Sequence, residues 1–238
     1  MTDLILALDQ GTTSSRSILF TEKAEIRAVA SEPLECRYPD SGWVEQDAEA
    51  IWETQRSTIV KVLDQAGIGL SEVSAIGITN QRESTIAWNR ETGEALCPAI
   101  NWQCRRTAGF CDELKEEGFD ELIRNRTGLV TDPYFSGTKM HWILQNVPEA
   151  ANLARQGKLC FGTVDSWLIW KLSGGTTHAI EISNASRTLV FDIQKCEWDS
   201  EILSRFGIPP ESLPEVVPSS GVIAEVDESL FGSSAPIA

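Results

Sequence analysis

A polar loop near the N-terminus carries the residue types that bind anions. It starts at Asp9, continues as Gln-Gly-Thr-Thr-Ser-Ser and ends at Arg16, between two apolar runs. A hairpin turn needs only two residues, so this loop is longer than a chain reversal requires. Successive backbone N–H groups in a tight turn form a concave anion site, but the same residue types are common in ordinary turns. Taken alone, the loop favours neither interpretation, and it matches neither the Walker A loop nor the dinucleotide-binding glycine motif.

A second polar run follows an apolar stretch that predicts a buried strand. Residues 77–83 read Gly-Ile-Thr-Asn-Gln-Arg-Glu. Ligands of open α/β sheets gather at the carboxyl ends of strands. Arg82 beside Glu83 supplies hydrogen-bond donors and acceptors together, as a polyhydroxylated ligand needs. For this run alone, a solvated turn with a local ion pair is the simpler interpretation.

Two later clusters place aromatic side chains among polar ones. Residues 101–107 include Trp102, whose ring can form an apolar wall against the carbon face of a polyol. A partly buried Trp at a helix start explains this cluster equally well. Residues 132–139 predict a helix start with Ser136 as its N-cap and Tyr134 facing a cleft. The alternative there is a loop and a cap without a ligand.

The composition is that of a globular protein of one or two domains. The chain has 238 residues, of which 42% are hydrophobic and 23% charged, and its formal net charge is −15. This charge argues against nucleic acid or an anionic membrane as a partner, because both are bound by clustered Lys and Arg. A small phosphorylated ligand is still compatible, since it needs only local donors and a metal ion.

Neither a membrane span nor a secretory leader is recognisable in the sequence. No apolar run approaches about 18 residues, and no signal peptide is visible. The six cysteines lack a Cys-x-x-Cys pair, and the chain has two histidines. We therefore expect reduced thiols in a cytoplasmic protein rather than a zinc site.

The hydrophobic pattern predicts a strand meander followed by alternating helices and strands. Asp47 is the expected N-cap of a helix that ends at Gly67. Strands are expected at 4–8, 17–20, 26–30, 73–79, 84–88, 158–161 and 190–193, helices at 105–117, 119–125, 136–147, 163–172 and 199–206, and a loop at 209–218. This order is typical of ribonuclease-H-like domains, the building block of actin-like ATPases. It predicts an α/β fold in which helices flank a mixed sheet of antiparallel and parallel strands.

The clusters together resemble motifs of the FGGY family of carbohydrate kinases. Residues 9–16 are similar to the family's first phosphate loop, and residues 78–83 with 102–106 are similar to its two-part substrate motif. Residues 134–146 are similar to its first signature, and residues 162–168 and 183–188 to two further motifs. The resemblance extends over residues 4–238. The segments Asn-Gln-Arg-Glu and Trp-Gln-Cys-Arg-Arg resemble the substrate motif of the members that phosphorylate glycerol rather than that of the pentulose kinases.

The resemblance implies a role for each residue of the polar clusters. It implies that ATP, Mg²⁺ and glycerol are bound and that sn-glycerol 3-phosphate is formed. The phosphates of ATP would meet Thr12, Thr13, Ser14 and Arg16, and Asp9 would hold Mg²⁺ through water. Arg82, Glu83 and Tyr134 would hydrogen-bond the glycerol hydroxyls, and Trp102 would cover the carbon backbone.

The resemblance also implies that the chain is one half of a kinase. The family's catalytic base is an Asp in a Gly-Asp-Gln motif just past an Ile-Ala segment similar to residues 237–238, so no catalytic base is expected within the chain. We expect residues 1–238 to be the N-terminal, glycerol-binding domain, without the C-terminal nucleotide-binding domain and inactive alone. The parent is expected to be a cytoplasmic homo-oligomer. Residues 227–234 contain no Lys or Arg, so the sugar bisphosphate loop of some members is not expected.

Two alternatives remain open from the sequence. The chain could belong to an FGGY kinase that acts on another polyol or on a ketose. It could also be a non-catalytic, actin-like module that binds a polyol or a protein without chemistry. A substrate panel separates the first alternative, and a Gly-Asp-Gln motif in the longer chain argues against the second.

Overall fold

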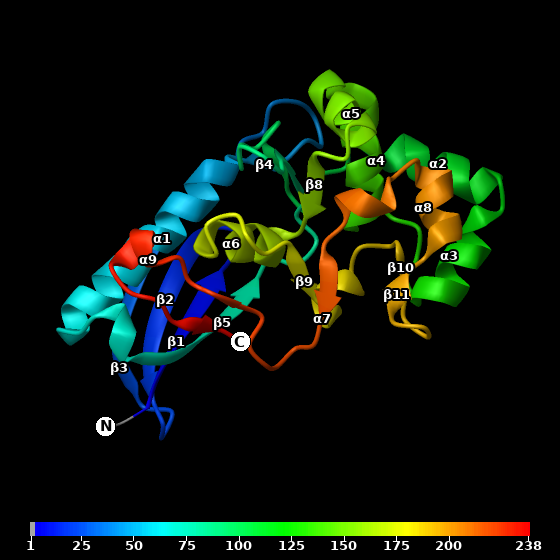
Figure 1. Ribbon diagram of the computed structural model, residues 1–238. Coiled ribbons are helices and arrows are strands. Elements are labelled where there is room, and N and C mark those ends of the chain that lie inside the picture. The colour runs from blue at the N-terminus through cyan, green and yellow to red at the C-terminus, as the bar shows by residue number, and fades with distance from the viewer. Residues whose placement is uncertain (1–2) are drawn as a thin grey trace.

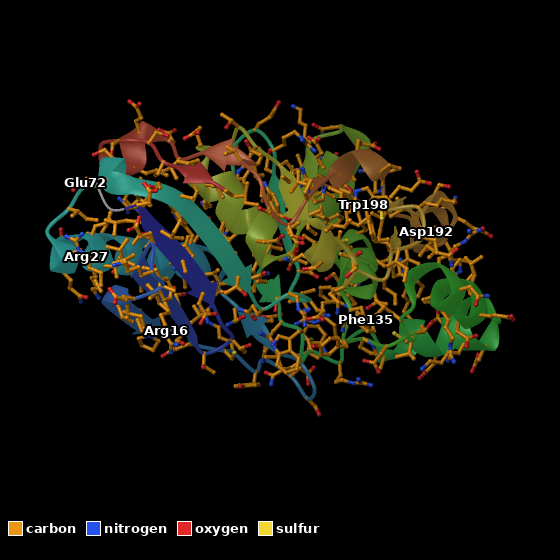
Figure 2. All side chains as sticks on the ribbon, turned by 90° about the horizontal axis from the view of Figure 1, so that it is seen from below. Arg16, Arg27, Glu72, Phe135, Asp192 and Trp198 are labelled. Atoms are coloured by element: carbon orange, nitrogen blue, oxygen red, sulfur yellow. The ribbon has the colours of Figure 1, made fainter. Side chains whose placement is uncertain are left out.

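A six-stranded mixed sheet and a group of helices lie side by side in the computed structural model, which describes residues 3–238 (Figures 1 and 2). The strand order is β13-β14-β5-β1-β2-β3. The strands are β1 (Leu4–Gln10), β2 (Ser14–Thr21), β3 (Ile26–Pro33), β5 (Val73–Asn80), β13 (Ala224–Glu225) and β14 (Pro236–Ile237). Strands β1, β2 and β3 form the predicted antiparallel meander, and β5 runs parallel to β1. The expected mixed sheet with flanking helices is therefore confirmed.

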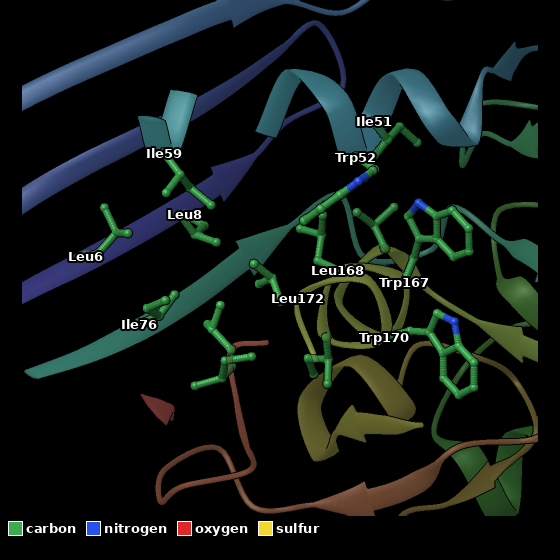
Figure 3. Close-up of a cluster of buried hydrophobic side chains, with 14 of the residues drawn as sticks. Leu6, Leu8, Ile51, Trp52, Ile59, Ile76, Trp167, Leu168, Trp170 and Leu172 are labelled. Atoms are coloured by element: carbon green, nitrogen blue, oxygen red, sulfur yellow. The ribbon is translucent and has the colours of Figure 1, made fainter. Parts of the chain in front are cut away.

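Two helices cover one face of this sheet. Helix α1 (Ala48–Ala66) begins at Asp47, whose carboxylate accepts from two backbone N–H groups, and it ends at Gly67. Helix α6 (Val164–Leu172) packs beside it, and Figure 3 shows their apolar side chains meeting those of the sheet. Alternate residues of β1, such as Leu6 and Leu8, point into this core. The residues between them, which include Asp9, point to the face that α1 and α6 leave open.

A two-stranded ribbon separates this core from a second one. Strand β6 (Ile86–Asn89) pairs antiparallel with β8 (Leu159–Gly162). Trp88 and its partner Cys160 point into the first core, whereas Ala87 and its partner Phe161 point into the second. Both faces of the ribbon are thus buried, and this explains why its sequence is apolar without alternation.

The second core lies among the helices. These are α2 (Ala108–Glu116), α3 (Phe119–Thr127), α4 (Ser136–Asn146), α5 (Pro148–Arg155) and α8 (Ser200–Phe206). Three further short strand pairs are β4 (Glu45–Gln46) with β7 (Ala99–Ile100), β9 (Ala179–Glu181) with β12 (Glu215–Val217), and β10 (Phe191–Asp192) with β11 (Glu197–Trp198). The remaining elements are α7 (Ile182–Ala185), α9 (Glu228–Phe231) and two 3₁₀ turns, Leu70–Glu72 and Pro210–Ser212.

Some predicted elements differ from the observed ones for physical reasons. The helix expected from residue 105 begins at Ala108, because 101–106 form the loop after β7. Helix α5 was not predicted; it is short and starts with Pro148 in its first turn. The expected loop at 209–218 contains β12, which pairs in parallel with β9. Within residues 3–238, no helix is long and apolar enough to cross a membrane.

His178 is expected to make stability depend on pH. It packs against Trp88 and donates from Nε2 to the Phe161 carbonyl at 2.8 Å. Burial lowers the pKa of His178 from 6.5 to about 4. The unfolded chain therefore binds a proton below pH 6.5 that the folded chain takes up only near pH 4. Stability should fall over this interval by up to about 3 kcal/mol through this group.

Urea denaturation of the wild type and of His178→Gln at pH 6.5 and pH 4 measures this contribution. The wild type should lose more stability than the Gln variant between the two conditions. Equal losses would show that burial does not oppose protonation of His178.

Candidate functional site

The ends of β1 and β5 bring the two N-terminal polar runs together. In the parallel pairing of these strands, Asp9 is the partner of Thr79, and Gln10 is the partner of Asn80. The loops that leave both strands therefore start side by side. A cavity of about 240 Å³ lies between them. All four predicted substrate residues line it, together with two of the predicted phosphate and metal residues: Arg82, Glu83, Trp102, Tyr134, Asp9 and Thr12.

The other three predicted phosphate-loop residues do not line this cavity. Thr13 and Arg16 are exposed, and Ser14 is the half-buried first residue of β2. Asp9 and Arg16 are direct partners across β1 and β2, so both side chains lie on the open face of the sheet. No ion pair joins them within 4 Å in the part of the chain that the structure describes. Both charges are therefore available to a ligand at the rim of the cavity.

A network of buried amide side chains lies beneath the cavity. Gln81 donates from Nε2 to Gln10 Oε1 at 3.0 Å and to the Gly11 carbonyl at 3.1 Å. Asn101 donates to Gln81 Oε1 at 3.0 Å and to Gln46 Oε1 at 2.9 Å. Gln46 in turn donates to the Thr12 carbonyl at 2.8 Å. The network thus fixes the predicted phosphate loop, the 81–84 loop and the loop after β7 relative to one another.

Trp102 is held in place from both sides of the cavity. Its backbone N–H donates to Ser84 Oγ at 3.1 Å, and its indole N–H donates to Thr12 Oγ1 at 2.8 Å. Its ring meets Tyr134 edge to face, with 5.5 Å between the ring centroids. Trp102 lines the cavity, and an indole ring can serve there as an apolar wall.

Glu83 and Arg82 occupy very different environments. Glu83 is 3% exposed, whereas Arg82 is exposed and forms no ion pair within the described residues. The local ion pair considered for the sequence Arg-Glu is therefore not formed. Glu83 Oε1 instead accepts from Arg187 Nε at 2.8 Å. Sequence reasoning did not single out Arg187, although it noted the 183–188 segment that contains it.

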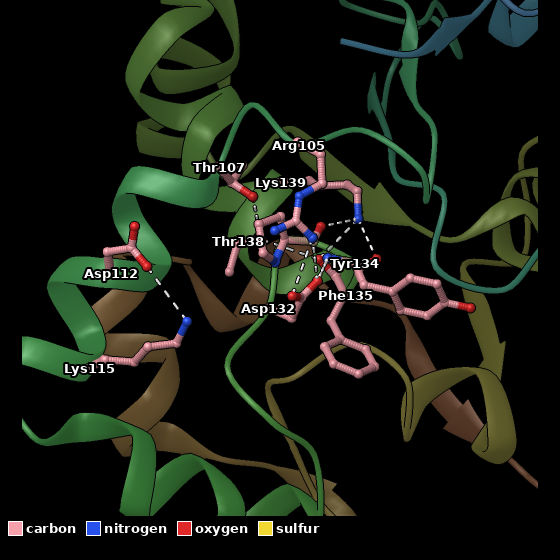
Figure 4. A network of polar contacts seen from close by, with 10 residues as sticks. Arg105, Thr107, Asp112, Lys115, Asp132, Tyr134, Phe135, Thr138 and Lys139 are labelled. Atoms are coloured by element: carbon pink, nitrogen blue, oxygen red, sulfur yellow. Dashed lines mark hydrogen bonds and ion pairs between the residues drawn. The ribbon is translucent and has the colours of Figure 1, made fainter. Parts of the chain in front are cut away.

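Tyr134 lies on a loop whose backbone carbonyls accept hydrogen bonds from a buried lysine. Lys139 is fully buried and donates to three carbonyls, those of Pro133, Tyr134 and Phe135, at 2.9, 2.5 and 3.1 Å. In Figure 4 the ring of Tyr134 points away from this polar network. Burial lowers the pKa of Lys139 to about 7. The three carbonyls oppose that effect, because they match the three N–H bonds of the ammonium form.

The Tyr134 hydroxyl remains a hydrogen-bond donor at neutral pH. Burial and the neighbouring Glu83 carboxylate raise the pKa of Tyr134 above its usual value.

The prediction that Ser136 caps α4 is wrong. Phe135 precedes the helix without a side-chain cap, and the Ser136 hydroxyl donates to the Glu83 carbonyl at 3.2 Å. Ser136 thus ties the start of α4 to the site.

Asp9 fits a magnesium ion that is bound largely through water and phosphate. No hydrogen bond or ion pair occupies its carboxylate among residues 3–238, and the side chain is half-buried at the rim of the cavity. Over the same residues, no group of three or more His, Cys, Asp or Glu side chains could hold a metal ion. Mg²⁺ commonly takes one or two carboxylates and completes its shell with water and substrate phosphates. A single free carboxylate is compatible with that mode.

Replacement of Lys139 by Met should destabilise the protein and loosen the Tyr134 loop. Three buried carbonyls would lose their donor, at a cost of about 2–4 kcal/mol. Urea denaturation gives the stability, and hydrogen exchange at residues 134–136 reports the loop. The exposed Lys115, paired at 3.6 Å with Asp112 (Figure 4), is the control, and Lys115→Met should change stability by less than about 0.5 kcal/mol. Equal effects of the two substitutions would contradict this role of Lys139.

Comparisons with known proteins give consistent matches. A family model described as "FGGY family of carbohydrate kinases, N-terminal domain" matches residues 4–235. "Glycerol kinase 1" of Clostridium tetani is 54% identical over 238 residues, which are 100% of this chain and 48% of that protein. "Glycerol kinase" of Carboxydothermus hydrogenoformans is 52% identical over 234 residues, which are 98% of this chain and 47% of that protein.

A solved structure agrees with these sequence matches. The crystal structure of Plasmodium falciparum glycerol kinase with ADP has a TM-score of 0.93 and 30% sequence identity to this chain. The match covers 100% of this chain and 48% of the other. The chain spans about half the length of the curated relatives it matches.

Proposed function

Because the chain belongs to the FGGY family of carbohydrate kinases, as its motifs predicted, we propose that it is the glycerol-binding half of an ATP-dependent glycerol kinase. The whole enzyme would transfer the γ-phosphoryl group of ATP to glycerol and form sn-glycerol 3-phosphate. One observation carries the proposal: Arg82, Glu83, Trp102 and Tyr134 line one cavity beside Asp9. A cytoplasmic homo-oligomer is part of the same proposal.

The cavity offers glycerol one apolar wall and several polar partners. The Trp102 ring packs against the carbon atoms, where no hydrogen bond is needed. The Glu83 carboxylate accepts from one glycerol hydroxyl, while the Tyr134 hydroxyl and the Arg82 guanidinium donate to glycerol oxygens. The buried amides beneath keep the cavity rigid, so that little conformational entropy is lost on binding.

The loop between β1 and β2 binds the phosphates of the other substrate, ATP. Thr13 exposes its hydroxyl, and Arg16 stands across β1 and β2 from Asp9. These groups and the hydroxyls of Thr12 and Ser14 would donate to phosphate oxygens, and Asp9 would hold a magnesium ion through water. Bound Mg²⁺ neutralises phosphate charge, and positioning with charge neutralisation supplies most of the catalysis in phosphoryl transfer.

The direction of β14 supports the expectation that the catalytic base follows this segment in a longer protein. Ile237 is the parallel partner of Ile76, and the Ala238 N–H donates to the Ile76 carbonyl at 2.9 Å. Continuing in this register, the next residues would run beside Ile78–Asn80 to the edge where Asp9 lies. A cavity of about 550 Å³, whose lining includes Ile78, Asn80 and Asn184, lies beside this path.

A substrate panel on the full-length protein tests the function. Coupled ADP release with glycerol, other polyols and ketoses should show the highest kcat/KM with glycerol. Residues 1–238 alone should show no turnover, because a general base contributes about 10²–10⁴ to the rate. A preference for a ketose would assign the chain to another member of the family, and turnover by residues 1–238 would mean that a base lies within them.

Arg82→Ala in the full-length protein should weaken use of glycerol far more than use of ATP. A hydrogen bond from a charged group contributes about 1.5–3 kcal/mol, so KM for glycerol should rise by about 10–100-fold. Arg82 has no protein partner among the described residues, and the loss would therefore report the ligand contact directly. Arg27, exposed at the opposite ends of the strands (Figure 2), is the control for Arg→Ala; it donates to the Ala66 carbonyl at 3.1 Å and is remote from the cavity. An unchanged KM for glycerol would remove Arg82 from the site.

A further inference from the structure

Glu83 faces the cavity with its charge balanced by one distant residue. Arg187 follows α7, lies 104 positions along the chain, and donates from Nε to Glu83 Oε1 at 2.8 Å. The Glu83 side chain is 4% exposed and that of Arg187 is 28% exposed. A carboxylate that is removed from water needs such a partner. Arg187 bonds one of the two oxygens, which restrains rotation of the carboxylate and leaves the second oxygen without this partner.

Arg187 is itself fixed by aromatic rings. Its guanidinium carbon lies 5.0 Å from the centroid of the Phe135 ring and 6.0 Å from that of Tyr134. Both rings belong to the loop that Lys139 holds. Arg187 therefore contacts two parts of the site together, the Glu83 carboxylate and the Tyr134 loop.

The backbone that follows Arg187 is tightly constrained. The Gly137 N–H donates to the Thr188 carbonyl at 2.6 Å, and a Cβ on Gly137 would lie only 2.7 Å from that oxygen. The next residue, Leu189, is fully buried at φ 70°, which is unfavourable for a leucine. Strained backbone of this kind persists where the surrounding structure determines it and is common at functional sites. The segment cannot shift without breaking its contact with α4.

We propose that Arg187 is a positioning residue of the polyol site, which orients the Glu83 carboxylate toward the ligand hydroxyl and aligns it with Tyr134. This inference rests on the proposed function. Arg187 acts through Glu83, so it affects the polyol and not the nucleotide. Without it, the carboxylate is free to rotate, and the ligand hydroxyl loses an acceptor held at a fixed position.

A double-mutant cycle in the full-length kinase tests this role. Arg187→Gln should lower kcat/KM for glycerol by up to about 100-fold, the scale expected when a contact is misplaced by about 1 Å. KM for ATP should stay unchanged. In the Glu83→Gln background, Arg187→Gln should have little further effect on kcat/KM, because the group on which Arg187 acts has already been changed. A merely structural role would give the same loss in both backgrounds.

Arg205 provides a matched control within the same chain. It also pairs with a carboxylate, Glu117, at 2.8 Å, lies over the Phe110 ring at 5.3 Å, and has a side chain 28% exposed. It is remote from the cavity in the fold. Arg205→Gln should leave kcat/KM for glycerol unchanged.

The conservative variant Arg187→Lys protects the test against misfolding of the Gln variant. It keeps the charge but loses the planar guanidinium, so KM for glycerol should rise by less than in Arg187→Gln. If neither Arg187 variant changes glycerol kinetics while Glu83→Gln does, the positioning role is wrong and the proposed function stands. If Glu83→Gln leaves glycerol use unchanged, the polyol site itself is misplaced, and both proposals fail.

Discussion

The candidate site depends on four buried amide side chains, those of Gln10, Gln46, Gln81 and Asn101. Each donates from its NH₂ group, and each oxygen accepts from a neighbour. Rotating any one of them would leave several buried groups unsatisfied, at a cost of about 1–3 kcal/mol each. The network therefore permits one arrangement of the three loops above it. The cavity, the Trp102 indole and the loop between β1 and β2 all take their relative positions from this arrangement.

Much of the fold could be predicted because it follows from local patterns. The meander, α1 with its Asp47 cap, and β5 were expected from apolar runs and capping residues, and the structure confirms them. The actin-like architecture agrees with the similarity to the Plasmodium falciparum kinase. The polar runs were located because they follow strands, and the parallel pairing of β1 with β5 brings two of them together. Strand ends and turn residues are short-range signals, and this explains why they could be read from the sequence.

The remaining features arise from contacts between distant segments. Gln46 is an ordinary polar residue until Asn101, 55 positions away, donates to it. The partner of Glu83 is Arg187 rather than the adjacent Arg82, since only the folded chain brings the residue after α7 to the loop after β5. Ser136 was interpreted as a cap because its position suits one, yet its hydroxyl bonds the Glu83 carbonyl instead. In each case the sequence shows the residue type but not its hydrogen-bond partner. The partner depends on the tertiary structure.

The ribbon of β6 and β8 has a consequence for folding. One of its faces completes the core beneath the sheet, and the other completes the core among the helices. Neither half can therefore unfold without exposing apolar side chains, Trp88 on one side or Phe161 on the other, that the remaining half cannot cover. Two cores that share a wall behave as one cooperative unit, although each alone has the size of a small domain. The cavity between the loops that follow β1 and β5 lies where the halves meet, so its geometry lasts as long as the whole chain stays folded.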